Sequence, residues 1–226
     1  MNKRARNETR VGRRAILVLA TAALTSLLPG CSLGVMAGKV LFGDPKQKSH
    51  FRSATGVDLT KGEKSLLIVC TAPHSILNHH PSIQLDVVDR MTRHLETRKV
   101  NVVAADDVAN WMDDHGDWGD FSELAHEFDA DYVMLIEVES FTCSVPDSPH
   151  LLQGKADGKV RVMQASEDSG EELVQSFDRT FTVEYPAYPI SRESKSEPLF
   201  TEGFLDRIAM HLAHYLYDHR SSETVY

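Results

Sequence analysis

Three histidines, His74, His79 and His80, stand close together in the chain, and Asp106 and Asp107 follow a later apolar run. Neutral imidazoles and carboxylates can hold Zn²⁺ with one coordination position left open, as a metal-dependent hydrolase requires. Both groups follow predicted strands, and ligands of open α/β sheets bind beyond the carboxyl ends of the strands. The alternative is an exposed loop followed by helix caps. We favour this alternative, because neither a His-Glu-x-x-His element nor paired cysteines accompany these residues.

A second polar group, His211, His214 and Asp218, lies at helical spacing near the end of the chain. These side chains could bind a metal or titrate near neutral pH. The polar flank of a helix explains the spacing more simply. The chain has no Gly-x-Ser-x-Gly, P-loop or Gly-x-Gly-x-x-Gly motif. The sequence therefore predicts a protein that is not an enzyme and has no cofactor.

The most specific motif ends at Cys31. Leu28, Gly30 and Cys31 match the lipobox of bacterial lipoproteins, in which the signal peptide is cut before a cysteine that becomes lipidated. Pro29 is a less usual residue at its position. A generic secretory signal cut near Gly30 is the alternative, but only lipidation requires a cysteine there. Two or three acyl chains on Cys31, palmitate among them, would anchor the protein stably.

The residues before Cys31 have the anatomy of a signal peptide. Residues 1–14 carry six cations and one acid, and residues 15–28 are apolar or small. This run of 14 residues is shorter than the roughly 20 that a membrane-spanning helix needs. Arg13 and Arg14 resemble a twin-arginine export signal, although Gly12 replaces the usual Ser or Thr. We expect residues 1–30 to be removed.

The body that remains is acidic. Cleavage after Gly30 leaves 196 of the 226 residues and, with six cations and one anion gone, changes the formal charge from −9 to −14. Such a body has no electrostatic footprint for nucleic acid or for anionic lipid. The expected partners are a membrane, through the lipid anchor, and an envelope protein.

Apart from Cys31, the chain has two cysteines, Cys70 and Cys143. Both fall near the ends of predicted strands, so one disulfide could form in an exported protein. Two buried thiols are the alternative, which we favour because Cys70 ends an apolar run.

Hydrophobic periodicity predicts the elements that position these residues. A tether is expected over residues 31–64. The pattern then indicates inner strands, followed by antiparallel strands with one solvent-exposed face. A last amphipathic helix carries an apolar stripe over 204–216. The inner strands are predicted at 66–70, 100–105 and 132–136, the antiparallel strands at 156–164 and 173–185, and the main helices at 83–95 and 198–218.

Together these elements predict an α/β (α+β) fold with a mixed sheet in the order β-α-β-α-β-β-β-α. Helices are expected mainly on one face of the sheet, and the C-terminal helix in the core. A single domain covers residues 65–220, and residues 221–226 form a tail.

With this order, the chain resembles a group of bacterial envelope lipoproteins. The group includes the penicillin-binding-protein activator lipoproteins, the curli-secretion lipoprotein and the N-terminal domain of the Tol translocation protein. The resemblance rests on the lipobox at Cys31, a small mixed α/β body and the terminal amphipathic helix. Residues 41–46, 129–138 and 217–220 also resemble uncharacterised secreted proteins of planctomycetes.

The resemblance implies binding or assembly work and carries over no functional residue. The resulting expectation is a non-enzymatic lipoprotein of the cell envelope, with its body facing the periplasm. A hydrolase that uses the loop from His74 to His80 remains the alternative.

Overall fold

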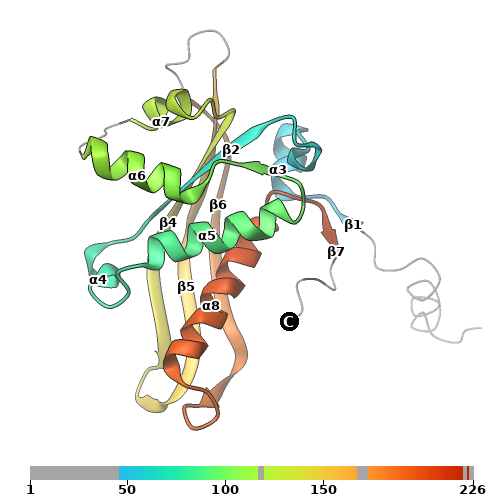
Figure 1. Ribbon diagram of the computed structural model, residues 1–226. Helices are drawn as coiled ribbons and strands as arrows, with labels where there is room; N and C mark the ends of the chain where they lie inside the picture. Colours follow the sequence, from blue (N-terminus) through green and yellow to red (C-terminus); the bar gives the residue numbers. More distant parts are fainter. Residues whose placement is uncertain (1–45, 117–119, 167–172, 221–222, 224–226) are drawn as a thin grey trace, which may run out of the picture. The chain divides into compact units, whose positions relative to one another are not determined.

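The structure, a computed structural model, describes residues 46–116, 120–166, 173–220 and 223 (Figure 1). The chain divides into two compact units. The second comprises Lys46–His219 and residues 223–226 and contains the main sheet. The predicted signal peptide, Cys31 and the first part of the tether lie outside the described residues.

A five-stranded mixed sheet in the order β3-β2-β4-β5-β6 forms the centre of the body. Its strands are β2 (Ser65–Thr71), β3 (Asn101–Val102), β4 (Tyr132–Val145), β5 (Ser148–Ala165) and β6 (Leu173–Ser191). β2 runs parallel to both β3 and β4, whereas β4, β5 and β6 are antiparallel. The predicted mixed α/β fold class is confirmed.

The two main predicted helices are present, but the second ends at Ala213 and not at residue 218. Additional helical elements lie at both ends of β2. Two two-residue strands, β1 (Lys46–Gln47) and β7 (His219–Arg220), lie outside the main sheet. The helical elements are α3 (His50–Thr55), the 3-10 turn η1 (Leu59–Lys61), α4 (His74–Leu77), α5 (Ile83–Glu96), α6 (Ala105–His115), α7 (Phe121–Glu127) and α8 (Glu197–Ala213).

Alternation along β2 sends its side chains to two separate cores. Ile68 and Cys70 join a large cluster with α5 and α8, and Leu67 and Val69 join a smaller one with α6 and α7. Continuous burial along β2 is what a strand covered on both faces requires. The large face holds α3, α5 and α8, in line with helices mainly on one face, while α6 and α7 cover the other.

The folded body begins earlier than the sequence predicted. The expected tether extended to residue 64, but α3 and η1 place Phe51 and Leu59 in the core at 0% exposure. Ser49 caps α3 by accepting a hydrogen bond from the backbone N–H of Arg52 at 3.0 Å. These elements were missed because each contributes one buried residue, which is too few to produce a period.

Candidate functional site

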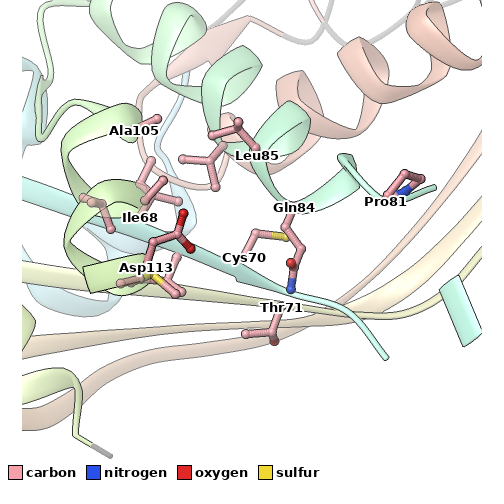
Figure 2. Close-up of a pocket in the computed structure, with 13 residues that line it drawn as sticks. Ile68, Cys70, Thr71, Pro81, Gln84, Leu85, Ala105 and Asp113 are labelled. Atoms are coloured by element: carbon pink, nitrogen blue, oxygen red, sulfur yellow. The ribbon is translucent and has the colours of Figure 1, made fainter. Parts of the chain in front are cut away.

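A groove of about 220 Å³ opens beside the C-terminal half of β2, between α5 and α6 (Figure 2). Its floor is the run from Ile68 to Thr71. Leu85 and Val88 of α5 line one wall, and α6 lines the other with the residues Ala105, Val108, Ala109, Met112 and Asp113.

The groove exists because β3 is short. β3 pairs with β2 only at Ser65 and Leu66, and the backbone N–H of Val103 then donates to the carbonyl of Leu66 at 2.9 Å. The sequence predicted a strand over 100–105, but α6 already begins at Ala105. Among the described residues, no strand pairs with this edge of β2 beyond Leu66.

Strand geometry identifies the backbone groups on the open edge. Leu66 turns its carbonyl toward β3, so Ile68 and Cys70 turn their N–H and C=O groups the same way, while Leu67 and Val69 face β4. Two consecutive donor–acceptor pairs therefore line the floor of the groove.

Polar side chains without partners stand on both walls. Within the ranges that the structure describes, neither Gln84 of α5 nor Asp113 of α6 has a hydrogen bond or ion pair. Leu85 is 46% exposed, which makes it one of the few large apolar side chains on the described surface. The groove thus combines free backbone groups, an apolar wall and an unpaired carboxylate.

The residues of the predicted metal site are not brought together. His74, at the start of α4, and His79 are exposed, and Asp106 and Asp107 are exposed in the first turn of α6. Neither Asp106 nor Asp107 borders the cavities that His79 and His80 line. In the described part of the chain, no three His, Cys, Asp or Glu side chains could hold a metal ion.

The two aspartates do not cap α6 either. The N-cap of α6 is Ala104, which makes no side-chain cap hydrogen bond. Asp106 and Asp107 instead lie in the first turn, where a carboxylate interacts favourably with the helix dipole.

His79 and His80 line a different cavity, of about 360 Å³, together with Cys143 and Glu197. The His80 ring packs edge-on against Phe141 at 4.7 Å between centroids, and burial lowers the pKa of His80. A partly buried histidine with a structural role typically packs against an aromatic ring and has a neutral imidazole, as His80 does.

Both remaining cysteines are free and buried, so the structure contains no disulfide between Cys70 and Cys143. Burial raises the pKa of Cys70 to about 12. Burial also raises the pKa of Cys143, whose Sγ accepts a hydrogen bond from Thr201 Oγ1 at 3.5 Å. A nucleophilic cysteine needs a thiolate near neutral pH, and neither site favours one.

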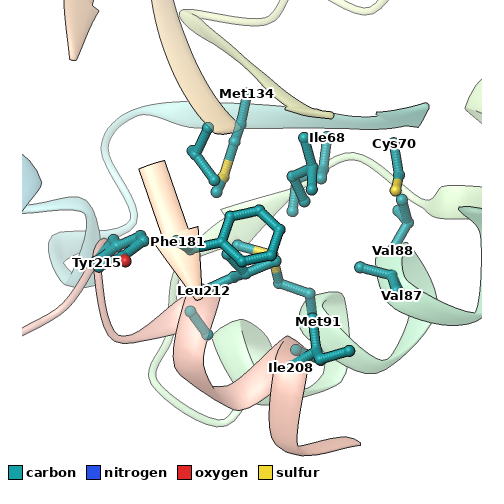
Figure 3. Packing of buried hydrophobic residues seen from close by; sticks show 14 of the residues in the cluster. Ile68, Cys70, Val87, Val88, Met91, Met134, Phe181, Ile208, Leu212 and Tyr215 are labelled. Carbon is teal, nitrogen blue, oxygen red and sulfur yellow. The ribbon is translucent and has the colours of Figure 1, made fainter. Parts of the chain in front are cut away.

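The C-terminal histidines, predicted as a polar flank, are largely buried. His214 and His219 are 5% and 7% exposed, and their rings stack at 4.2 Å. His211 Nε2 lies 3.1 Å from the hydroxyl of Tyr215, a residue at the margin of the large core (Figure 3). Burial first, then the nearby His219, lowers the pKa of His214 to about 3.

Asp218 joins the beginning and the end of the folded body. It accepts a hydrogen bond from the backbone N–H of Ser49 at 2.9 Å and pairs with Arg52 at 2.6 Å. The backbone N–H of Phe51 also donates to the carbonyl of Tyr215 at 2.9 Å. The histidine group therefore belongs to a structural junction between α3 and the end of α8.

No helix in the described ranges has both the length and the apolar character to cross a membrane.

No known family profile matches the sequence, and no curated protein matches it. Among solved structures, lipoprotein GNA1162 from Neisseria meningitidis has a TM-score of 0.42 and 13% identity, over 61% of this chain and 90% of its own. A PelC dodecamer subunit from Paraburkholderia phytofirmans has a TM-score of 0.41 and 12% identity, over 76% and 97%. The C-terminal domain of LpoB from Salmonella enterica has a TM-score of 0.32 and 12% identity, over 58% and 88%.

One of these structural neighbours, GNA1162, is named as a lipoprotein. Likenesses with TM-scores below 0.5 establish neither a common family nor a common activity. The resemblance to planctomycete proteins stays a prediction.

Proposed function

We propose that this chain is a lipid-anchored envelope protein whose body binds another protein and catalyses no reaction. The observation that carries the proposal is the groove beside β2. An unpaired strand edge, an apolar wall and an unpaired carboxylate are features of a binding surface.

The chemistry of the described side chains supports binding over catalysis. The hydrolase alternative needs His74, His79 or His80 close to Asp106 or Asp107. Neither aspartate borders the cavities that His79 and His80 line, and no three metal-ligating side chains gather in the described ranges. A thiol nucleophile is disfavoured at both cysteines, since burial raises the pKa of each.

The anchor is proposed from the sequence. The lipobox ending at Cys31 places a lipid on the first residue of the processed chain, and the acidic body disfavours nucleic acid and anionic lipid as partners. The body would then face the periplasm and meet its partner in the cell envelope.

Site-specific photocrosslinking in membranes of the native host tests the proposal. A photoreactive amino acid at Leu85 lies in the groove, and the same group at Leu199, which is 60% exposed on α8 outside the groove, is the matched control. We expect a discrete protein adduct from position 85 and none from position 199. The proposal fails if both positions give no adduct or the same set of adducts.

The anchor is tested separately with a fatty-acid label. We expect incorporation into the wild type and none into Cys31→Ala. Equal labelling of both proteins would exclude lipidation at Cys31.

A further inference from the structure

We propose that the groove takes an extended segment of the partner protein as an added strand on β2. One face of this segment is apolar, and the other carries a lysine or arginine opposite Asp113. The inference rests on the proposed function and specifies how the partner is recognised.

The backbone of β2 supplies the first argument. Ile68 and Cys70 present their N–H and C=O groups to an edge on which no described strand pairs. Both residues line the groove, so an incoming chain can reach these backbone groups, which no described strand pairs. An added strand satisfies these groups, and it is the recognition mode in which main-chain hydrogen bonds provide affinity.

The length of the open edge sets the size of the ligand. At about 3.3 Å per residue, the edge from Leu67 to Thr71 extends about 13 Å and accepts a stretch of about four residues. The groove is closed at one end by β3 and walled by α5 and α6, so a short segment fits better than the long edge of a second sheet.

The negative charge of α6 favours a basic residue in the bound segment. α6 carries the exposed carboxylates Asp106, Asp107, Asp113 and Asp114 and no lysine or arginine. Asp113 lines the groove without an ion-pair partner in the described ranges. A cation on the incoming segment meets this carboxylate, whereas an acidic segment is repelled.

The apolar side chains of the α5 wall favour apolar residues on the face of the segment that packs against them. Leu85 and Val88 of α5 border the groove, and Leu85 is half exposed. In a strand, successive side chains point to opposite faces, so apolar residues alternating with basic ones place each type against its own wall.

The probe is a synthetic peptide with blocked ends, in which valine and lysine alternate. Its binding to the full-length protein in detergent is compared with that of two analogues, one N-methylated at every valine and one at every lysine. All valine N–H groups point to one edge of an extended strand and all lysine N–H groups to the other. Charge and side chains are identical in the three peptides.

Strand addition predicts that only the analogue methylated on the edge facing β2 loses affinity, by about tenfold or more. Equal affinity of the three peptides, or equal loss in both analogues, overturns strand addition. No binding of the parent peptide also overturns it, and so does self-association of the protein alone that Leu85→Asp abolishes, because a second copy would then occupy the groove.

The charge contact is tested with Asp113→Asn and its control Asp114→Asn, the neighbouring exposed carboxylate that does not line the groove. Because an exposed ion pair contributes little, Asp113→Asn should weaken binding by about twofold to fivefold and Asp114→Asn by less. Equal loss in both variants contradicts the contact at Asp113. These outcomes are distinct from a failure of the proposed function, which a lack of adducts at position 85 in native membranes would show.

Discussion

The two faces of β2 and β4 are covered to very different depths. On one face, α5 and α8 pack into a cluster of 35 buried residues. Met91, Ile208 and Leu212 of the helices and Ile68 of β2 are among its members (Figure 3). On the other face, α6 and α7 share a cluster of eight, and Val108 is the one buried residue of α6.

The difference in burial between the two faces indicates which wall of the groove is more rigid. α5 belongs to the large core, so its wall is held by many contacts. α6 is held by few, and regions with few buried apolar contacts open at lower free energy. The wall formed by α5 is therefore expected to be the more rigid of the two.

Truncation of one apolar side chain on each face gives the largest expected difference in stability between the two faces. Phe204 of α8 is fully buried, and its ring covers Gly154 so closely that a Cβ there would lie 2.5 Å from the ring. We expect Phe204→Ala to lower the free energy of unfolding by about 3–5 kcal/mol. Val108→Ala on the thin face removes two methyl groups, at about 0.8 kcal/mol each. Urea denaturation measures both, and equal losses would contradict the comparison.

Acid should weaken the large face through His214. The folded protein keeps His214 neutral, since burial and the neighbouring His219, His211, Arg98 and Arg207 lower its pKa to about 3. The unfolded chain binds a proton at the ordinary pKa of about 6.5, so stability is complete above that pH and falls as the pH drops from 6.5 toward 3.

At about 1.4 kcal/mol per pH unit, this histidine alone removes about 2 kcal/mol between pH 7 and pH 5. Denaturation curves of the wild type and His214→Gln across that range give the measurement, and His214→Gln should lose less. His126→Gln, at an exposed site on α7, is the control and should follow the wild type. Identical pH slopes for wild type and His214→Gln would refute the role of His214.

A smaller effect, of opposite sign, is expected on α5. Thr92 is 8% exposed, and its Oγ1 has no hydrogen-bond partner in the described ranges. Thr92→Val keeps the shape and removes the unsatisfied hydroxyl, so it should stabilise the protein by about 1 kcal/mol. Thr97→Val is the control, because Thr97 Oγ1 donates to the carbonyl of His94 at 2.7 Å. A loss of stability in Thr92→Val would show that its hydroxyl has a partner after all.

The sequence predicted the parts of the fold that have a clear local pattern. The inner strand at 132–136 and the apolar stripe over 204–216 are buried as expected. These predictions succeed because each depends on a local pattern, a continuous apolar run for the strand and a helical period for the stripe.

The candidate site depends on features that have no period. The groove exists because β3 ends after two residues, and residues 100–105 are as apolar as a full strand would be. The histidine junction depends on α3, which is distant in sequence from His214 and His219. Neither arrangement leaves a local pattern, so only the tertiary structure reveals them.

Amide hydrogen exchange along β2 tests the open edge most directly. Leu67 and Val69 donate toward β4, whereas Ile68 and Cys70 face the edge without a described partner strand. We predict that the amides of Ile68 and Cys70 exchange about tenfold or more faster than those of Leu67 and Val69, and that the valine–lysine peptide slows only the fast pair. Uniform protection along β2 in the free protein would contradict an open strand edge, because the edge would then be closed.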